Sequence, residues 1–218
     1  MFERTNSAAA LQIWSRGIGL APGVGRDLDL RFTPRRAWPN EHAVVPRTAE
    51  GKRRQRVAAQ HLGERIAAQF LRDHGDTDVV PLGGTAMPFD VLTRQHAVEV
   101  KTGLVHTTAG SAQWRCSLPA LQGSEEARVS RMTEAERSRY MADKRAAMMQ
   151  RKADAVAEVQ RVIPVKPVTI ALILDPVVDG ALGKVDVFWF EGFHQRLGYR
   201  SPEARRAFRG TFLVQEAL

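Results

Sequence analysis

The sequence is organised around residues 89–101, which read Phe-Asp-Val-Leu-Thr-Arg-Gln-His-Ala-Val-Glu-Val-Lys. Two apolar runs, 89–92 and 97–101, stand on either side of the polar residues 93–96. Short runs of this kind, separated by a polar segment, predict two neighbouring strands joined by a hairpin turn.

Ionisable residues are placed within these runs in a way that brings them together. Side chains alternate between the two faces of a strand, so Glu99 and Lys101 should share one face while Val98 and Val100 take the other. Asp90 begins the preceding strand. We therefore expect three ionisable groups from adjacent strands to meet at one place.

The segment before the hairpin has a helical pattern over residues 51–74. Leu62, Ile66 and Phe70 recur at the spacing of one helix face and predict a core stripe. Glu64 lies on a different face, which is also apolar and small. Its carboxylate should lie either near the helix surface or directed into a site.

The longest helical pattern covers residues 131–162 and opens with Thr133 and Glu136 at capping-box spacing. Lys144 and Arg151 fall on its apolar seam. Either their aliphatic stems pack while the charges reach solvent, or the charges reach a phosphate or the site itself.

The rest of the pattern predicts an α/β protein with a mixed central sheet flanked by helices. Residues 168–174 are apolar on both faces, as in a central strand covered on both sides. Further expected elements are strands at 79–82, 113–118, 184–190 and 211–214, a loop at 121–129 and a short helix at 202–208.

Composition excludes several classes of protein. One cysteine among 218 residues rules out an internal disulfide and a cysteine-rich zinc site. No apolar stretch approaches the roughly 20 residues of a membrane-spanning helix, and no signal-peptide pattern opens the sequence, so we expect a cytoplasmic protein. The formal charge of +8 suits nucleic acid, although surface arginines that serve solubility would give the same value.

Residues 1–50 are rich in Gly and Pro and predict an extended N-terminal arm. Residues 1–56 hold eleven basic and five acidic residues, a net of +6. We expect the arm to pack on its own domain, on a neighbouring subunit of a homo-oligomer, or within a larger assembly. A core at 51–175 and a C-terminal extension of the same domain at 176–218 complete the predicted organisation.

Converging carboxylates are the ligands that Mg²⁺ or Mn²⁺ prefers. Asp90 and Glu99 could bind such an ion through their side chains, Val100 through its backbone carbonyl, and Glu64 directly or through water. Lys101 could orient a water molecule or neutralise charge on a phosphate. The alternative is a surface hairpin with ordinary strand charges.

The segment resembles the PD-(D/E)XK nuclease superfamily. Pro88-Phe89-Asp90, followed after eight residues by Glu99-Val100-Lys101, is similar to its motif, with Phe89 between the proline and the aspartate. Residues 63–71 are similar to the first helix of Holliday-junction-resolvase-like members. The resemblance covers about 55–175 and implies an αβββαβ core, Mg²⁺-dependent DNA cleavage, Asp90 and Glu99 as metal ligands, Lys101 as the catalytic lysine and Glu64 as an auxiliary residue.

Basic residues outside the motif are candidates for DNA contacts: Lys52, Arg53, Arg54, Arg56, Lys144 and Arg151. Two other functions stay open. The nuclease fold could serve as a structural or DNA-binding subunit of a larger assembly, such as a phage particle, with weak or no catalysis. The chain could also be a basic α/β interaction domain in which the Glu-x-Lys pattern is accidental.

Overall fold

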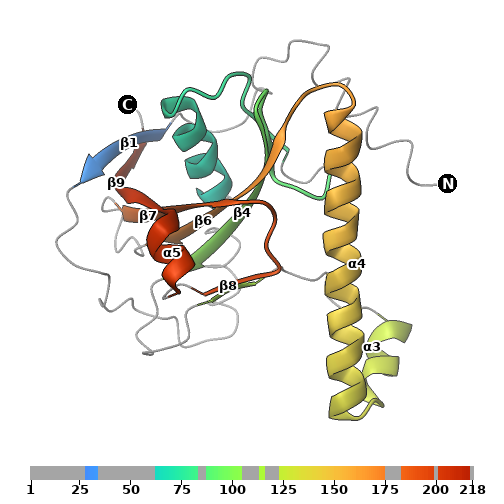
Figure 1. The fold of residues 1–218 in the computed structure, drawn as a ribbon. Helices are drawn as coiled ribbons and strands as arrows, with labels where there is room; N and C mark the ends of the chain where they lie inside the picture. Colours follow the sequence, from blue (N-terminus) through green and yellow to red (C-terminus); the bar gives the residue numbers. More distant parts are fainter. Residues whose placement is uncertain are drawn as a thin grey trace.

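The computed structural model describes residues 28–33, 62–82, 87–104, 113–115, 123–174, 183–198 and 201–216. They form an α/β protein with a seven-stranded sheet in the order β1-β9-β7-β6-β4-β3-β2 and a separate two-stranded sheet, β5-β8 (Figure 1). A helix covers residues 62–73. The other elements are β1 (Leu28–Thr33), β2 (Val80–Pro81), β3 (Val91–Leu92), β4 (His96–Leu104), β5 (Gln113–Arg115), α3 (Ser124–Ser130), α4 (Glu134–Gln160), β6 (Lys166–Leu174), β7 (Gly183–Glu191), β8 (Arg196–Gly198), α5 (Pro202–Ala207) and β9 (Phe208–Glu216).

The large sheet is mixed, as the sequence predicts. β4 and β6 run parallel, with Glu99 opposite Thr169 and Lys101 opposite Ala171. The other strand pairs in this sheet are antiparallel. β6 lies between β4 and β7, and residues 168–174 are buried throughout, which confirms the predicted central strand.

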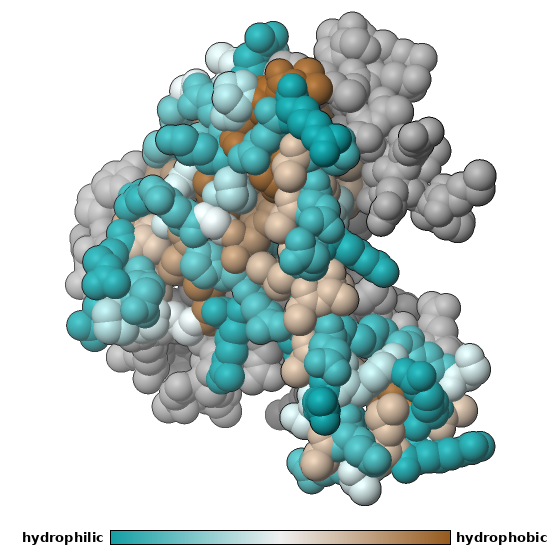
Figure 2. All heavy atoms as spheres, turned by 45° about the vertical axis from the view of Figure 1, so that its right-hand side comes forward, coloured by the Kyte–Doolittle hydropathy of each residue, from teal (hydrophilic) through white to brown (hydrophobic). Residues whose placement is uncertain are grey.

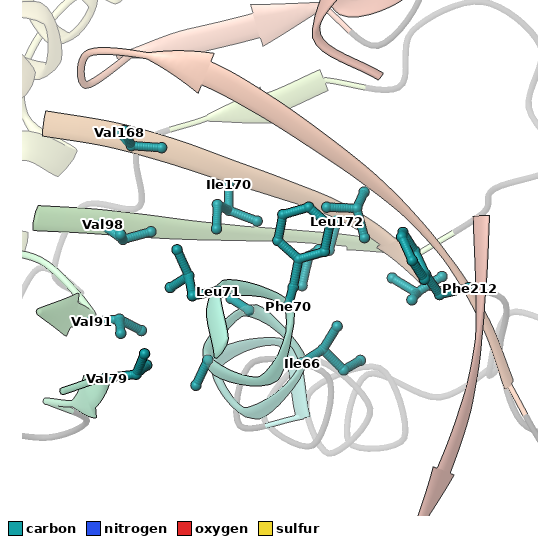
Figure 3. Close-up of a cluster of buried hydrophobic side chains, with 14 of the residues drawn as sticks. Ile66, Phe70, Leu71, Val79, Val91, Val98, Val168, Ile170, Leu172 and Phe212 are labelled. Atoms are coloured by element: carbon teal, nitrogen blue, oxygen red, sulfur yellow. The ribbon is translucent and has the colours of Figure 1, made fainter. Parts of the chain in front are cut away.

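Helix 62–73 covers one face of the sheet (Figure 3). Ile66 and Phe70 are buried against Val98 of β4 and Ile170 of β6, so the predicted core stripe is confirmed. The branched and aromatic side chains here leave water together, which favours folding by about 25 cal/mol per Å² of apolar area buried.

The C-terminal end of α4 covers the other face. Val156 and Val159 pack in one cluster with Ala97 of β4, whereas the next residue of that strand, Val98, faces helix 62–73. The start of α4 has the predicted capping box: the Glu136 backbone N–H donates to Thr133 Oγ1, and the Thr133 N–H donates to the Glu136 carboxylate. This cap satisfies backbone donors at the helix N-terminus.

The loop expected at 121–129 is wrong in part, because residues 124–130 form helix α3. A helix this short has little stability of its own, and its sequence has no strong periodicity. Val129 of α3 is buried, and two side chains of α4 contact the helix: Tyr140 and Lys144 both donate to the Glu125 carboxylate. In Figure 2 this end of the molecule lies at lower right, with mostly hydrophilic side chains on its surface.

Both ends of the described chain join the large sheet. Residues 28–33, within the predicted arm, form β1 and pair with β9 from Thr33 opposite Thr211 to Leu28 opposite Glu216. The rest of residues 1–50 lies outside the described residues. Within the described part of the chain, no helix has both the length and the apolar character needed to cross a membrane.

Candidate active site

The hairpin formed by β3 and β4 positions the site. At its turn, the Thr93 backbone N–H donates to the His96 carbonyl over 2.8 Å, and Thr93 Oγ1 accepts from the backbone N–H groups of Gln95 and His96. At the other end, the Asp90 N–H donates to the Val98 carbonyl over 2.8 Å. The turn predicted over residues 93–96 is thus confirmed, and it fixes Asp90 beside the middle of β4.

Asp90 is attached directly to β4 by its side chain. Its Oδ2 accepts a 2.7 Å hydrogen bond from the backbone N–H of Val100. In an antiparallel pair, the N–H and C=O of one residue point to the same side of the strand. The Val100 carbonyl therefore lies on the side of β4 that carries Asp90.

Glu99 and Lys101 share a face of β4, as predicted, and both are buried, with relative exposures of 8% and 5%. The Lys101 Nζ donates to Glu99 Oε1 over 3.2 Å. Val98, on the opposite face, belongs to the core beneath helix 62–73. One face of β4 is thus apolar and packs beneath helix 62–73, and its other face carries the charges of Glu99 and Lys101.

A second buried lysine, which the sequence reasoning missed, reaches the same carboxylate from α4. Lys152 Nζ donates to Glu99 Oε2, and the side chain of Lys152 is 6% exposed. The available signal was its spacing: Lys152 stands four residues before Val156 and seven before Val159, on the stripe that faces the sheet.

For Lys144 and Arg151 of α4, the alternatives were charges that reach solvent and charges that reach a phosphate or the site. Lys144 pairs with Glu125 of α3 over 2.6 Å, and Arg151 is exposed. The seam inferred from sequence contains Val159, which is buried, and Ala155, which packs against the same cluster, but it omitted Lys152 and Val156. A DNA contact by Lys144 or Arg151 stays a prediction.

Glu64 approaches from helix 62–73 and is 9% exposed. Its neighbour Gly63 lies so close to β4 that a Cβ atom there would stand 2.1 Å from Thr102 Oγ1. The glycine permits this close approach of the helix to the strand. Of the two alternatives for Glu64, the structure supports the one in which it is directed inward.

The carboxylates are close enough to affect one another electrostatically. Burial raises the pKa of Asp90 from 3.8 to about 7, and the negative charges of Glu99 and, more weakly, Glu64 contribute to the rise. The hydrogen bond from Val100 and the positive charge of Lys152 act in the opposite direction. Buried like charges of this kind raise the free energy of the ionised site until a cation compensates them.

The side-chain carboxylates at this site could bind a hard divalent cation only if backbone carbonyl or water oxygens complete its coordination. Asp90 and Glu99 offer carboxylate oxygens, and the Val100 carbonyl lies on the side of Asp90. Within the described residues, no group of three or more His, Cys, Asp or Glu side chains is arranged to hold a metal ion. Mg²⁺ commonly keeps several water ligands and needs only one or two carboxylates, so these residues fit Mg²⁺ or Mn²⁺.

Four predicted DNA-contacting residues, Lys52, Arg53, Arg54 and Arg56, lie outside the described residues. Comparison of the chain with protein-family models, with curated proteins and with solved structures found no match. The functional argument therefore depends on the chemistry of the site.

Proposed function

We propose that the protein is a divalent-metal-dependent nuclease that hydrolyses phosphodiester bonds of DNA. The observation that carries this proposal is the convergence of Asp90, Glu99 and Lys101, with Lys101 hydrogen-bonded to Glu99 over 3.2 Å in a buried position. Buried clusters of carboxylates and a lysine cost stability, and they occur most often where a protein needs their chemistry.

The order of the elements supports the finer assignment to a restriction-endonuclease-like fold. Helix 62–73 is followed by β2, β3 and β4, and later by α4 and β6. This order contains the αβββαβ core of the PD-(D/E)XK superfamily, with β5 and α3 inserted before α4.

In the proposed reaction, Asp90 and Glu99 would hold the metal ion together with the Val100 carbonyl, and Glu64 would contribute negative charge or a water contact. A divalent cation supplies an acidified water and a Lewis acid for the phosphate oxygen. Lys101 would orient that water and offset the negative charge that develops on the phosphate during attack. The surrounding burial strengthens these charge interactions, because few water molecules screen them.

DNA is the proposed partner, in keeping with the net charge of +8. The predicted contacts by Lys52, Arg53, Arg54, Arg56, Lys144 and Arg151 belong to this proposal. So does assembly through the N-terminal arm, either with further copies of the chain or within a larger particle.

A DNA-binding subunit with weak or no catalysis is the second candidate. The observation in its favour is that both oxygens of Glu99 already accept hydrogen bonds from lysines, Oε1 from Lys101 and Oε2 from Lys152. If those bonds persist in the presence of metal, Glu99 has less capacity to bind it.

Cleavage of labelled duplex DNA by the purified protein distinguishes the two candidates. We expect cleavage in Mg²⁺ or Mn²⁺ that stops with EDTA and is lost in Asp90→Ala, Glu99→Ala and Lys101→Ala, while thermal unfolding shows that the variants remain folded. Arg161→Ala, at the exposed C-cap position of α4, is the control and should cleave normally. Wild-type activity in Asp90→Ala would reject this site, and DNA binding without cleavage by the wild type would favour the second candidate.

A further inference from the structure

Lys152 is the one charged residue among the three buried positions of α4. Its Nζ lies against Glu99 Oε2 and 5.8 Å from the centre of the Phe193 ring. Its positive charge also acts on Asp90 and lowers the pKa of that carboxyl. The lysine is thus held among both of the carboxylates to which we assign metal binding.

Stability alone does not account for this arrangement. Removing an ammonium group from water costs several kcal/mol, and a buried ion pair is often no better than apolar side chains of similar size. Lys101 already neutralises Glu99 through Oε1. A methionine at 152 would continue the apolar stripe of Val156 and Val159 without burying a second charge.

The position of the ammonium group suggests an explanation. Nζ of Lys152 donates a hydrogen bond to Glu99 Oε2. A divalent cation held by Glu99 would bind the same kind of carboxylate oxygen, so the two compete. A lysine side chain has a flexible four-carbon stem and a compact charge, so it can change partners at low conformational cost. Phosphodiester oxygens are an alternative anionic partner for the same group.

We propose that Lys152 is an exchangeable counter-ion of the site. In the free protein, Lys152 neutralises Glu99 Oε2. When a divalent cation binds Glu99 Oε2, Lys152 transfers its hydrogen bond to a non-bridging phosphate oxygen of DNA. This inference rests on the proposed nuclease function and adds a substrate-binding role for a residue outside the Asp90–Glu99–Lys101 group. Lys152 opposes metal binding when DNA is absent and favours DNA binding when the metal is present.

The proposal predicts effects of opposite sign from one substitution. In Lys152→Met, the affinity for Mn²⁺, measured calorimetrically without DNA, should rise about tenfold, because a competing positive charge is gone. The affinity for a DNA duplex, measured by fluorescence anisotropy in Ca²⁺, should fall by about tenfold for the same loss of charge. Lys152→Arg keeps the charge and should restore most of the DNA affinity. Arg161→Met removes a charge at an exposed position with no assigned DNA contact and should change neither affinity by more than about twofold.

A purely structural lysine would not give this pattern. Unchanged Mn²⁺ affinity in Lys152→Met, or a loss of both affinities together, would overturn the proposal. A second measurement needs no variant: Mg²⁺ should increase the rate at which acetic anhydride acetylates Lys152 of the wild type, as followed by mass spectrometry. An unchanged or slower rate would also overturn it.

The results separate this inference from the nuclease proposal. If the wild type cleaves DNA but Lys152→Met leaves both affinities unchanged, the exchange is wrong and the nuclease assignment stands. If the wild type does not cleave but the two affinities move in opposite directions, the exchange stands in a protein that binds DNA and metal without hydrolysis.

Discussion

Helix α4 carries two lysines, Lys144 and Lys152, roughly two turns apart, in contrasting surroundings. Lys152 and its partner Glu99 have side-chain exposures of 6% and 10%, whereas Lys144 and its partner Glu125 have exposures of 25% and 32%. The outer pair joins α4 to α3 beyond the edge of the sheet (Figure 1). The inner pair lies between α4 and the sheet.

The difference in burial changes what each pair can contribute. An exposed ion pair remains largely hydrated and adds little to stability. A buried pair has lost most of its hydration, so removing one partner leaves an uncompensated charge. Charges that are both costly and close to other carboxylates are a better sign of function than those that only join two helices.

The largest effect on stability is expected at Glu99. Glu99→Gln removes the charge that both Lys101 and Lys152 contact, so the free energy of unfolding should fall by about 2–4 kcal/mol. Urea unfolding at neutral pH measures the change. Glu125→Gln is the matched control in the outer pair, and an equal loss there would show that burial does not separate the two pairs.

Replacing Asp90 should raise the free energy of unfolding, whereas replacing Glu99 should lower it. The pKa of Asp90 is raised to about 7 in the folded protein from 3.8, so its contribution to stability is fully present below pH 3.8 and is lost as pH rises through about 7. Asp90→Asn removes this loss and keeps an oxygen for the Val100 N–H. Metal-free Asp90→Asn should therefore be more stable than the wild type at pH 8 by about 1–3 kcal/mol.

The pH dependence provides the check on that prediction. Between about pH 4 and 8, urea unfolding in EDTA should show wild-type stability falling relative to Asp90→Asn as pH rises. If the difference in free energy of unfolding between the two proteins stayed constant across this range, the pKa of Asp90 would not be raised in the folded protein.

A substitution at Gly63 tests whether the close approach of helix 62–73 to β4 places Glu64 at the site. Gly63→Ala places a Cβ atom 2.1 Å from Thr102 Oγ1 unless helix or strand moves, and we expect a loss of about 1–3 kcal/mol in the free energy of unfolding. Thr102→Ala in the same chain removes the Oγ1 atom and leaves the Cβ of residue 102 at 3.3 Å, so it should recover most of the loss. No recovery in the double variant would place the cause elsewhere.

The smallest effect is expected at the outer pair. The Lys144 hydrogen bond is the main cause that lowers the pKa of Glu125, with Tyr140 next, yet the pair remains hydrated. Lys144→Met should leave the midpoint of thermal unfolding within experimental error at moderate salt. A clear fall in this midpoint would mean that α3 depends on the ion pair and not on its packing.

Local patterns predicted much of the fold. Alternation over 89–101 gave the hairpin and the common face of Glu99 and Lys101, and an apolar run gave the central strand β6. Such features depend on the spacing of residues within one segment.

Features that depend on contacts between distant segments were not predicted. Lys152 reaches Glu99 across 53 positions of sequence. Glu125 of helix α3 accepts hydrogen bonds from Tyr140 and Lys144 of another helix. Spacing places Lys152 on the same face of α4 as Val156 and Val159, but the partner of each contact lies in another segment, which spacing within one segment does not identify.

DNA cleavage by Asp90→Asn tests the central claim most directly, because this variant should be at least as stable as the wild type. In Mg²⁺ at pH 8, we predict that the wild type cuts a labelled duplex and that Asp90→Asn, folded and more resistant to urea, does not cut it. Such a result would show that the buried carboxylates are maintained for hydrolysis at a cost in stability. Wild-type cleavage by Asp90→Asn would contradict the account.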